Sequence, residues 1–271
     1  MNHQVYQSKK GRWIDVLAAL AGIAAVVSLL AYIFVKFNFS KKWDVFYKAF
    51  ITNGGYNRVL MGMKNTAIIA CLGLVIGIVI GTLIAIVKVT PPYKRIVRYG
   101  QKICNLYVSF FRGTPIAVQL LVGYYILFPV MGMILPAVNV CVVIFGLNSG
   151  AYISEIMRSG INSVDPGQLE AGRAVGLSFG TSMMKIVVPQ AVKNILPTLG
   201  NEFIALIKET AIVGYVGATD ICVAFQYIGS NSYEFMVPYI VMACIYIVLV
   251  LVISLLIRLM EKQLAKSDRK K

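Results

Sequence analysis

One apolar stretch of the chain carries a stripe of polar and charged side chains. If residues 195–216 form a helix that advances about 100° per residue, the stripe falls within roughly 120° of arc. The ammonium group of Lys208 can pair with the α-carboxylate of a ligand, and the carboxylate of Glu202 or Glu209 can pair with its α-amino group. The stripe therefore suits a zwitterionic ligand. The alternative is an ion pair that only fastens neighbouring helices. The stripe consists of Thr198, Asn201, Glu202, Ala205, Lys208 and Glu209.

A shorter polar track runs along residues 137–157. Asn148, Tyr152 and Glu155 are separated by four and three positions, which places them on one face of a helix. Arg158 follows Glu155 by three positions, and we interpret these two residues as an ion pair near the end of the helix. Two smaller residues, Ala151 and Ser154, complete the track.

The stretch 103–128 contains a bend signal, because it reads Arg-Gly-Thr-Pro from Arg112 to Pro115. Glycine permits a bend and proline removes a backbone donor, so we expect free carbonyl groups near residues 109–111 to face a cavity. Arg112 either lines that cavity with Thr114 or braces the helices from the cytoplasmic side.

A polar loop at about 165–192 separates two long apolar stretches. Helix-forming residues at 170–175 are followed by small residues and by a second short amphipathic turn that ends at Pro189. This order predicts a compact helix-turn-helix that docks into a groove of a partner protein. The alternative is a solvated connector between two spans.

The composition places these segments in a membrane. Of 271 residues, 58% are hydrophobic and 14% are charged, which is too apolar for a soluble domain. Runs of about 20 apolar residues can cross the ~30 Å hydrocarbon layer as helices surrounded by membrane lipid. The net charge of +15 comes from basic blocks beside these runs, so we expect no nucleic-acid partner. Six spans are predicted: 16–35, 66–87, 103–128, 137–157, 195–216 and 236–257.

The second predicted span carries glycine at every fourth position. Gly73, Gly77 and Gly81 therefore share one helix face. Small residues let helix backbones approach closely in lipid. We expect this span to pack tightly against a neighbouring helix.

The distribution of Lys and Arg sets the predicted orientation. Basic residues cluster at 88–102, around the polar loop and at 258–271, and the positive-inside rule places these regions in the cytoplasm. Six spans then place both termini in the cytoplasm, although residues 36–65, expected outside, contain several Lys and Arg residues of their own. No small-residue cleavage site follows the first span, so we interpret it as a retained anchor.

The remaining reactive residue types form no catalytic set. His3 is the single histidine, which excludes a His-based metal site and a Ser-His-Asp triad. The phosphate-binding pattern G-x-x-x-x-G-K-[ST] is missing, so ATP must bind another subunit. The five cysteines lie in apolar surroundings and serve as small hydrophobic residues. We expect neither a cofactor nor an enzymatic activity in this chain.

The polar loop resembles the EAA loop found in permease subunits of ATP-binding-cassette importers. Two departures, Gly172 in place of alanine and Val188 in place of leucine, keep small or aliphatic character. The Pro-Gln-Ala continuation at 189–191, Arg-Gly-Thr-Pro at 112–115 and the Asn-x-x-Ala-Tyr pattern at 148–152 are similar to the polar amino-acid branch of that family. The matching loop residues are Glu170, Ala171, Gly172, Gly176, Ile186 and Pro189.

The resemblance implies an all-α, polytopic membrane bundle with a five-helix permease core at 55–260. Residues 1–54 then add an N-terminal transmembrane anchor, and 261–271 form a basic cytoplasmic tail. Two ATPase subunits would grip the EAA loops, and an extracytoplasmic solute-binding protein would deliver a polar amino acid at the plasma membrane of a prokaryote. Two copies, or one copy and a related permease, would enclose the path. The residues implied to line it are Arg112, Thr114, Asn148, Ala151, Tyr152, Ser154, Glu202, Ala205, Lys208 and Glu209.

Other functions are alternatives at this stage. An importer of methionine or of quaternary amines would share the loop, but the Arg-Gly-Thr-Pro and Asn-Glu elements favour polar amino acids. A secondary transporter would use the carboxylates as proton or sodium ligands, yet such folds usually show two related halves, which this sequence lacks. A membrane sensor that engages an ATPase would leave the polar stripe without a purpose.

Overall fold

The computed structural model describes residues 38–268 without a gap, isolated residues between Leu17 and Lys36, and side chains as far as Leu264. All regular elements in this part of the chain are helices, as the sequence predicts. The expected first span, 16–35, and the end of the basic tail fall outside the continuously described residues. The first elements are α2 (Phe39–Tyr47) and the π-helical η1 (Lys48–Thr52).

Three of the described helices are long and apolar enough to cross a membrane. They are α3 (Gly55–Val89), α7 (Ala137–Asn162) and α12 (Met236–Asp268), the last with a qualifying stretch at Met236–Leu264. Two bent pairs raise the number of possible spans to five, which agrees with the expected five-helix core. The first pair consists of α4 (Arg95–Gly113) and a run of α5 (Ile116–Val122), η2 (Gly123–Leu127) and α6 (Phe128–Val130).

The second bent pair, Phe179–Val216 and Ile221–Ser232, begins within the polar loop. The loop forms α8 (Pro166–Ala174), α9 (Phe179–Ser182) and η3 (Met183–Val187), which continues directly into α10 (Val188–Glu209). A 3-10 helix, η4 (Thr210–Val216), then leads to α11 (Ile221–Ser232), and the two arms meet at 53°. The predicted span 195–216 lies within the first arm, Phe179–Val216, although its α-helix ends at Glu209 and Thr210–Val216 form a 3-10 helix.

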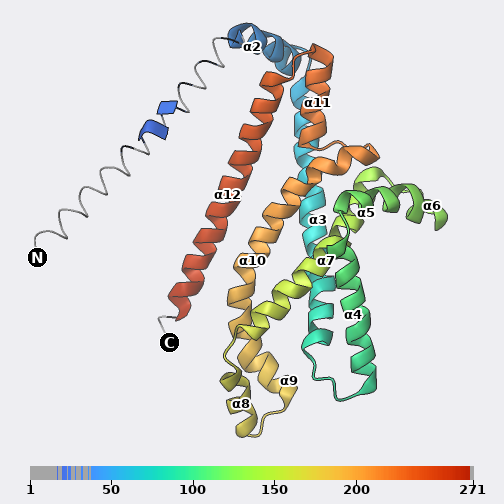
Figure 1. Ribbon diagram of the computed structural model, residues 1–271, viewed down its shortest axis with the longest axis vertical. Helices are drawn as coiled ribbons and strands as arrows, with labels where there is room; N and C mark the ends of the chain where they lie inside the picture. The colour runs from blue at the N-terminus through green and yellow to red at the C-terminus, as the bar shows by residue number, and fades with distance from the viewer. Residues whose placement is uncertain are drawn as a thin grey trace, which may run out of the picture.

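The predicted helix at 103–128 is also two helices. The chain turns by 103° between α4 and α5, because Pro115 donates no backbone hydrogen bond and Thr114 adopts an extended conformation. The α5–α6 run extends sideways from the bundle (Figure 1). The bend predicted from Gly113 and Pro115 is thus present, and it is sharp enough to end the first helix.

The glycines of α3 pack against α7. A Cβ atom at Gly77 would lie 3.0 Å from Ile153 Cδ1, and one at Gly81 would lie 2.7 Å from Ile153 Cγ2. The fit is reciprocal, because a Cβ atom at Gly146 of α7 would lie 2.6 Å from Ile76 of α3. Interlocking small residues allow this close backbone approach, which confirms the predicted tight packing.

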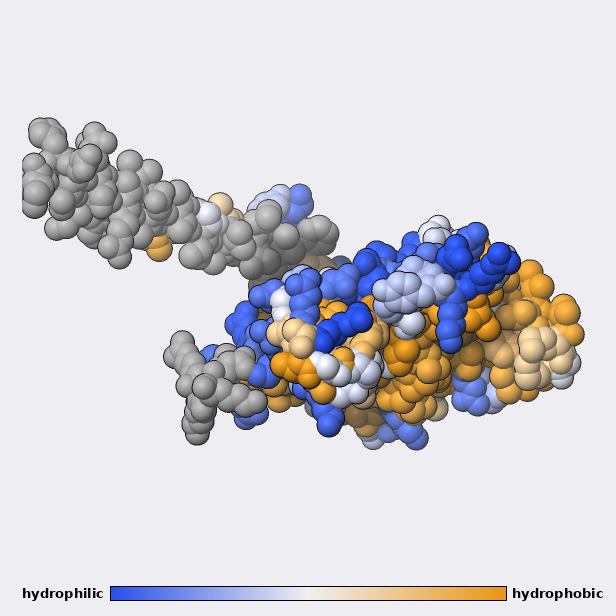
Figure 2. All heavy atoms as spheres, turned by 90° about the horizontal axis from the view of Figure 1, so that it is seen from below, coloured by the Kyte–Doolittle hydropathy of each residue, from blue (hydrophilic) through white to orange (hydrophobic). Residues whose placement is uncertain are grey.

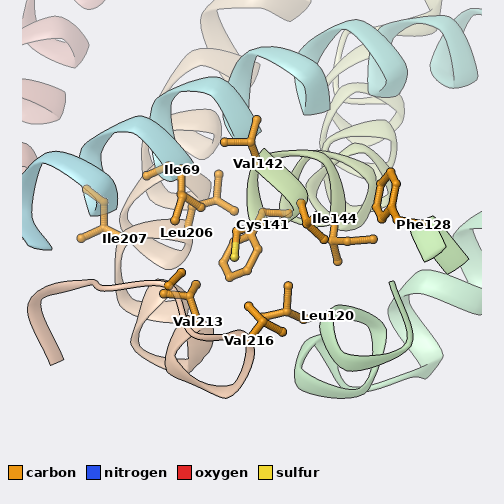
Figure 3. Packing of buried hydrophobic residues seen from close by; sticks show 14 residues of the cluster. Ile69, Leu120, Phe128, Cys141, Val142, Ile144, Leu206, Ile207, Val213 and Val216 are labelled. Atoms are coloured by element: carbon orange, nitrogen blue, oxygen red, sulfur yellow. The ribbon is translucent and has the colours of Figure 1, made fainter. Parts of the chain in front are cut away.

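The main apolar core lies where α3, α5, α7, α10 and η4 meet. Figure 3 shows Leu206 of α10 beside Ile69 of α3, with Val213 of η4, Leu120 of α5 and Ile144 of α7 around the same centre. These side chains are almost completely buried. In lipid, such a core is stabilised by close packing rather than by removal of water.

A buried carboxylate fixes the break between η4 and α11. Asp220 accepts hydrogen bonds from the backbone N–H groups of Cys222 and Val223 at 3.0 and 2.9 Å and so caps α11. The Tyr246 hydroxyl of α12 donates to the same carboxylate at 3.4 Å. Asn65 of α3 donates to the neighbouring Thr219 carbonyl at 2.8 Å. The break is thereby tied to both adjacent long helices.

The two ends of the bundle differ. The α8–α9 loop, the turn between α3 and α4 and the C-terminal end of α12 lie at the lower end of Figure 1, whereas α2 and α11 lie at the upper end. The described parts of the three regions predicted to be cytoplasmic therefore lie toward the same end. Figure 2 views the molecule from that end and shows hydrophilic side chains over it, with hydrophobic side chains on the α5–α6 run at the right.

Candidate functional site

The EAA-like loop is a defined helical unit. Asp165 caps α8 by accepting a hydrogen bond from the Gly167 N–H at 2.9 Å, and Pro166 occupies the first turn. At the other end, Gly176 has a φ of +86°, a conformation that favours glycine. The N–H of Leu177 donates to the Gly172 carbonyl and that of Gly176 to Arg173, which is the Schellman pattern of helix termination.

Two motif residues, Gly172 and Ile186, pack against each other inside the loop unit. Gly172 is buried, and a Cβ atom there would lie 2.8 Å from both Ile186 Cδ1 and Ser182 Oγ of η3 and α9. The predicted helix-turn-helix is therefore packed through the third motif position. Pro189 lies in the first turn of α10, so the packed unit continues without a break into a long helix of the bundle.

The opposite face of α8 is uncovered. Glu170, Ala171 and Ala174 are exposed, and the apolar Val175 is 77% exposed beyond the end of the helix. Met184 of η3 adds a second large apolar side chain at 69% exposure. Small and apolar residues on an exposed surface are typical of a protein-binding face.

A polar cavity of about 390 Å³ opens between α4, α7 and α10. Two of the predicted site residues, Arg112 and Tyr152, line it. The guanidinium group of Arg112 lies 5.3 Å from the ring centre of Tyr152. This distance is within the range of a cation–π contact between α4 and α7. Glu155 and Thr198 line it as well. Sequence reasoning did not single out the remaining lining residues, although four of them continue the helical face of Tyr152 at spacings of three to four positions. The missed residues are Ile156, Ser159, Gly160 and Ser163, and Asn194 of α10.

Asn148 lies in a closed hydrogen-bond network instead of in the cavity. It is buried, and its amide group donates to Gln119 Oε1 at 2.9 Å and to the Phe111 carbonyl at 3.3 Å. Gln119 donates in turn to the carbonyl groups of Phe111 and Thr114 at 2.9 and 3.0 Å. The carbonyl groups freed by the α4–α5 bend are thus satisfied by amides and do not face open space.

Ala151 and Ser154 are also fully buried. Ser154 donates its hydroxyl hydrogen to the Ala151 carbonyl at 2.8 Å, and its backbone lies against Gly81 of α3. Only Tyr152 of the predicted track is exposed, at 37%. The structure therefore divides the predicted track: Asn148, Ala151 and Ser154 are buried in packing contacts, whereas Tyr152 and Glu155 line the cavity.

The stripe on α10 occupies the less buried side of that helix. Glu202 accepts a hydrogen bond from the Ser149 hydroxyl of α7 at 2.8 Å. Lys208 is exposed and faces an apolar groove of about 450 Å³ that Tyr246 and other α12 residues line. Glu209 is half-buried, and neither it nor Lys208 forms an ion pair within the described part of the chain. Thr198 also reaches the polar cavity, and Asn201 is exposed.

The predicted ion pair between Glu155 and Arg158 is present and has a third member. Arg158 donates two hydrogen bonds to Glu155 Oε2 at 2.9 and 2.8 Å. Lys88 from the end of α3 donates to the other carboxylate oxygen. Sequence reasoning placed Lys88 among the orientation charges and missed this contact, because the two residues belong to different helices. The cluster joins α3 and α7 between the polar cavity and α8.

Comparison with known proteins agrees with this architecture. Residues 73–266 match the family described as "Binding-protein-dependent transport system inner membrane component". The putative glutamine transport system permease protein GlnP of Rickettsia bellii is 39% identical over 77% of this chain and 94% of its own length. The arginine transport system permease protein ArtQ of Bacillus subtilis is 36% identical over 78% and 94%.

A solved structure extends the similarity to three dimensions. The crystal structure of an amino acid ABC transporter with histidines has 38% sequence identity and a TM-score of 0.70, and it covers 77% of this chain and 94% of the matched chain. The sequence match, the paired broken helices and the packed polar loop agree. The chain belongs to the family of inner-membrane components of binding-protein-dependent transport systems, the multi-pass permease subunits of ATP-binding-cassette importers.

Proposed function

We propose that this permease moves a polar amino acid into the cell by ATP-driven alternating access. The observation that carries the proposal is the polar cavity between α4, α7 and α10, in a chain whose relatives are named for glutamine and arginine transport. The cavity offers a cation, a phenol and several amide or hydroxyl groups. Such a lining suits a small zwitterion better than an apolar solute.

Arg112 is the proposed contact for the substrate carboxylate. Its guanidinium group is exposed at the cavity edge and has no carboxylate partner among the described residues, so it is available for a bidentate pair. The Tyr152 ring lies 5.3 Å from the Arg112 guanidinium group, and Thr198 connects the cavity to the α10 stripe. Glu202, Ala205, Lys208 and Glu209 extend the proposed path along α10, whereas Asn148, Ala151, Ser154 and Thr114 support its walls.

The exposed face of α8 is the proposed contact for the ATPase subunit. Two such subunits would draw together the loops of two permease chains, which are either copies of this chain or this chain and a related one. The end with α2 and α11 would receive the extracytoplasmic solute-binding protein. Both termini of the permease lie in the cytoplasm in this arrangement.

The test is transport by the complete importer in proteoliposomes, with its ATPase and solute-binding protein. Radiolabelled glutamine and arginine should enter only when ATP is supplied on the ATPase side. Arg112→Gln should lower uptake at least about 10-fold, because losing one charge-assisted contact of about 1.5–3 kcal/mol has an effect of this size. The control Arg258→Gln removes an equal charge from α12, outside the cavity, and should transport normally.

Three results would contradict the proposal. Uptake driven by an ion gradient without ATP would indicate a secondary transporter. Preferred uptake of methionine or of a quaternary amine would indicate another substrate class. Equal uptake by the Arg112 and Arg258 variants would remove the cavity from the path.

A further inference from the structure

Residues 95–110 of α4 present charged and apolar side chains in two adjacent stripes. Arg95, Arg98 and Lys102 are three and four positions apart and form a basic stripe at the α8 end of the bundle. A second stripe follows one residue later and is strongly exposed: Ile96 at 77%, Tyr99 at 63%, Ile103 at 69%, Leu106 at 71% and Phe110 at 57%. The apolar stripe continues along α4 to Phe110, whereas the basic stripe ends at Lys102.

The opposite face of α4 is fixed to the bundle. Gln101 donates hydrogen bonds to the carbonyl groups of Thr90 and Val87 at 2.9 and 3.2 Å, which ties the helix to the end of α3. Tyr107 donates to the Leu147 carbonyl of α7 at 2.5 Å. The basic stripe is therefore held in one orientation and does not lie on a free loop.

The basic side chains enclose a small cavity and have no acidic partner. Arg95, Arg98, Tyr99 and Lys102 line a space of about 160 Å³, and none of the three cations is paired with a carboxylate among the described residues. The sequence has no Asp or Glu between Asp44 and Glu155. Three converging cations without a counter-charge form a site for an anion with several oxygen atoms.

We propose that this part of α4, residues 95–110, binds an anionic phospholipid of the adjacent leaflet. Its phosphate accepts hydrogen bonds from Arg95, Arg98 and Lys102, and one acyl chain lies along the exposed stripe from Ile96 to Phe110. The neighbouring apolar stripe distinguishes this assignment from a site for free phosphate, which would need no such surface. Hydrophilic side chains next to hydrophobic ones are visible at this end of the molecule (Figure 2).

The test is lipid binding by the full-length chain after delipidation in detergent. Binding of phosphatidylglycerol is compared with binding of phosphatidylcholine by native mass spectrometry, with inorganic phosphate as a separate arm. The triple variant Arg95→Gln, Arg98→Gln, Lys102→Gln should weaken phosphatidylglycerol binding roughly 100-fold, at about fivefold per basic residue near an anionic surface. The matched control, Lys41→Gln, Lys48→Gln, Lys64→Gln, removes three charges elsewhere and should bind normally.

Three outcomes would overturn the proposal. Equal lipid binding by the triple variant and the native chain would show that the stripe is not the site. Displacement of the lipid by millimolar inorganic phosphate would indicate an ion site. Loss of ATPase co-purification with unchanged lipid binding would assign the stripe to a protein contact. If the triple variant fails to fold, Arg98→Gln alone should weaken binding about fivefold. Because the readout is lipid binding, the result does not depend on which solute is transported.

Discussion

Replacing Gly172 by alanine is expected to loosen the α8 unit. The added Cβ atom would lie 2.8 Å from Ile186 Cδ1 and 2.8 Å from Ser182 Oγ, well inside ordinary contact, which begins at 3.4 Å. Overpacking of this kind costs about 1–3 kcal/mol when the neighbours must shift. A change of the Ile186 side-chain torsion can carry its terminal Cδ1 atom away, whereas Ser182 is fully buried and has little space around it. The serine is therefore expected to decide the size of the effect.

A second substitution should relieve the first. Ser182→Ala removes the oxygen atom nearest to the new Cβ, and that oxygen is a buried atom with no hydrogen-bond partner among the described residues. An unsatisfied buried polar atom costs about 1–3 kcal/mol, so the single variant Ser182→Ala should be neutral or stabilising. The double variant should recover most of the stability lost with Gly172→Ala.

The assay is the temperature at which half of the purified importer loses its ATPase subunit, together with ATP-driven uptake. Gly180→Ala provides the matched control, because Gly180 lies in the same loop and a Cβ atom there would meet no other atom within 4 Å. Gly172→Ala should lower the midpoint and uptake, while Gly180→Ala changes neither. The packing argument fails if the two alanine variants behave alike, or if Ser182→Ala does not restore Gly172→Ala.

Three further outcomes are expected. Gly81→Ala should reduce the yield of assembled protein more than Gly73→Ala, because the new Cβ would meet the fixed Ser154 backbone nitrogen at 2.9 Å, whereas at Gly73 the nearest atom is 3.4 Å away; equal yields would contradict this. Glu155→Gln should lower the free energy of unfolding by about 2 kcal/mol, since hydrogen bonds to charged groups contribute about 1.5–3 kcal/mol. An unchanged thermal unfolding midpoint would show that the ion cluster contributes little. Lys208→Met should leave assembly intact and lower uptake, because Lys208 has no ion-pair partner among the described residues; failed assembly with normal specific uptake would assign it to bundle packing.

The sequence predicted the helices better than their interruptions. Apolar length and the glycine spacing of α3 were sufficient to place that helix and its tight packing, because both signals are local. The 103° turn after α4 was only partly predictable. Gly113 and Pro115 indicate a bend, but its size depends on whether the freed carbonyl groups find other donors, which Gln119 and Asn148 provide from α5 and α7.

The same limit applies to the polar residues. Periodicity correctly placed Asn148, Tyr152 and Glu155 on one face, but it did not show that α4 and α5 cover the first of them. The contacts of Lys88 and Gln119 were missed because periodicity within one helix says nothing about other helices. Their partners, Glu155 and Asn148, lie 67 and 29 positions away in the sequence. The loop residues were predicted most completely, because α8, α9 and η3 are contiguous and their packing is set within about 25 residues.

The packing also shows how a movement of the loop would reach the cavity. Gly172 of α8 rests on Ile186 of η3, and η3 continues into α10 without an intervening turn. Ile195 of α10 lies against Gly160 of α7, so the two helices touch closely at the wall of the cavity lined by Asn194 and Thr198. We therefore expect a displacement of α8 to be passed through η3 to α10 rather than absorbed within the loop. A tilt of α10 about its contact with α7 would change the width of the cavity and the position of the stripe beyond it.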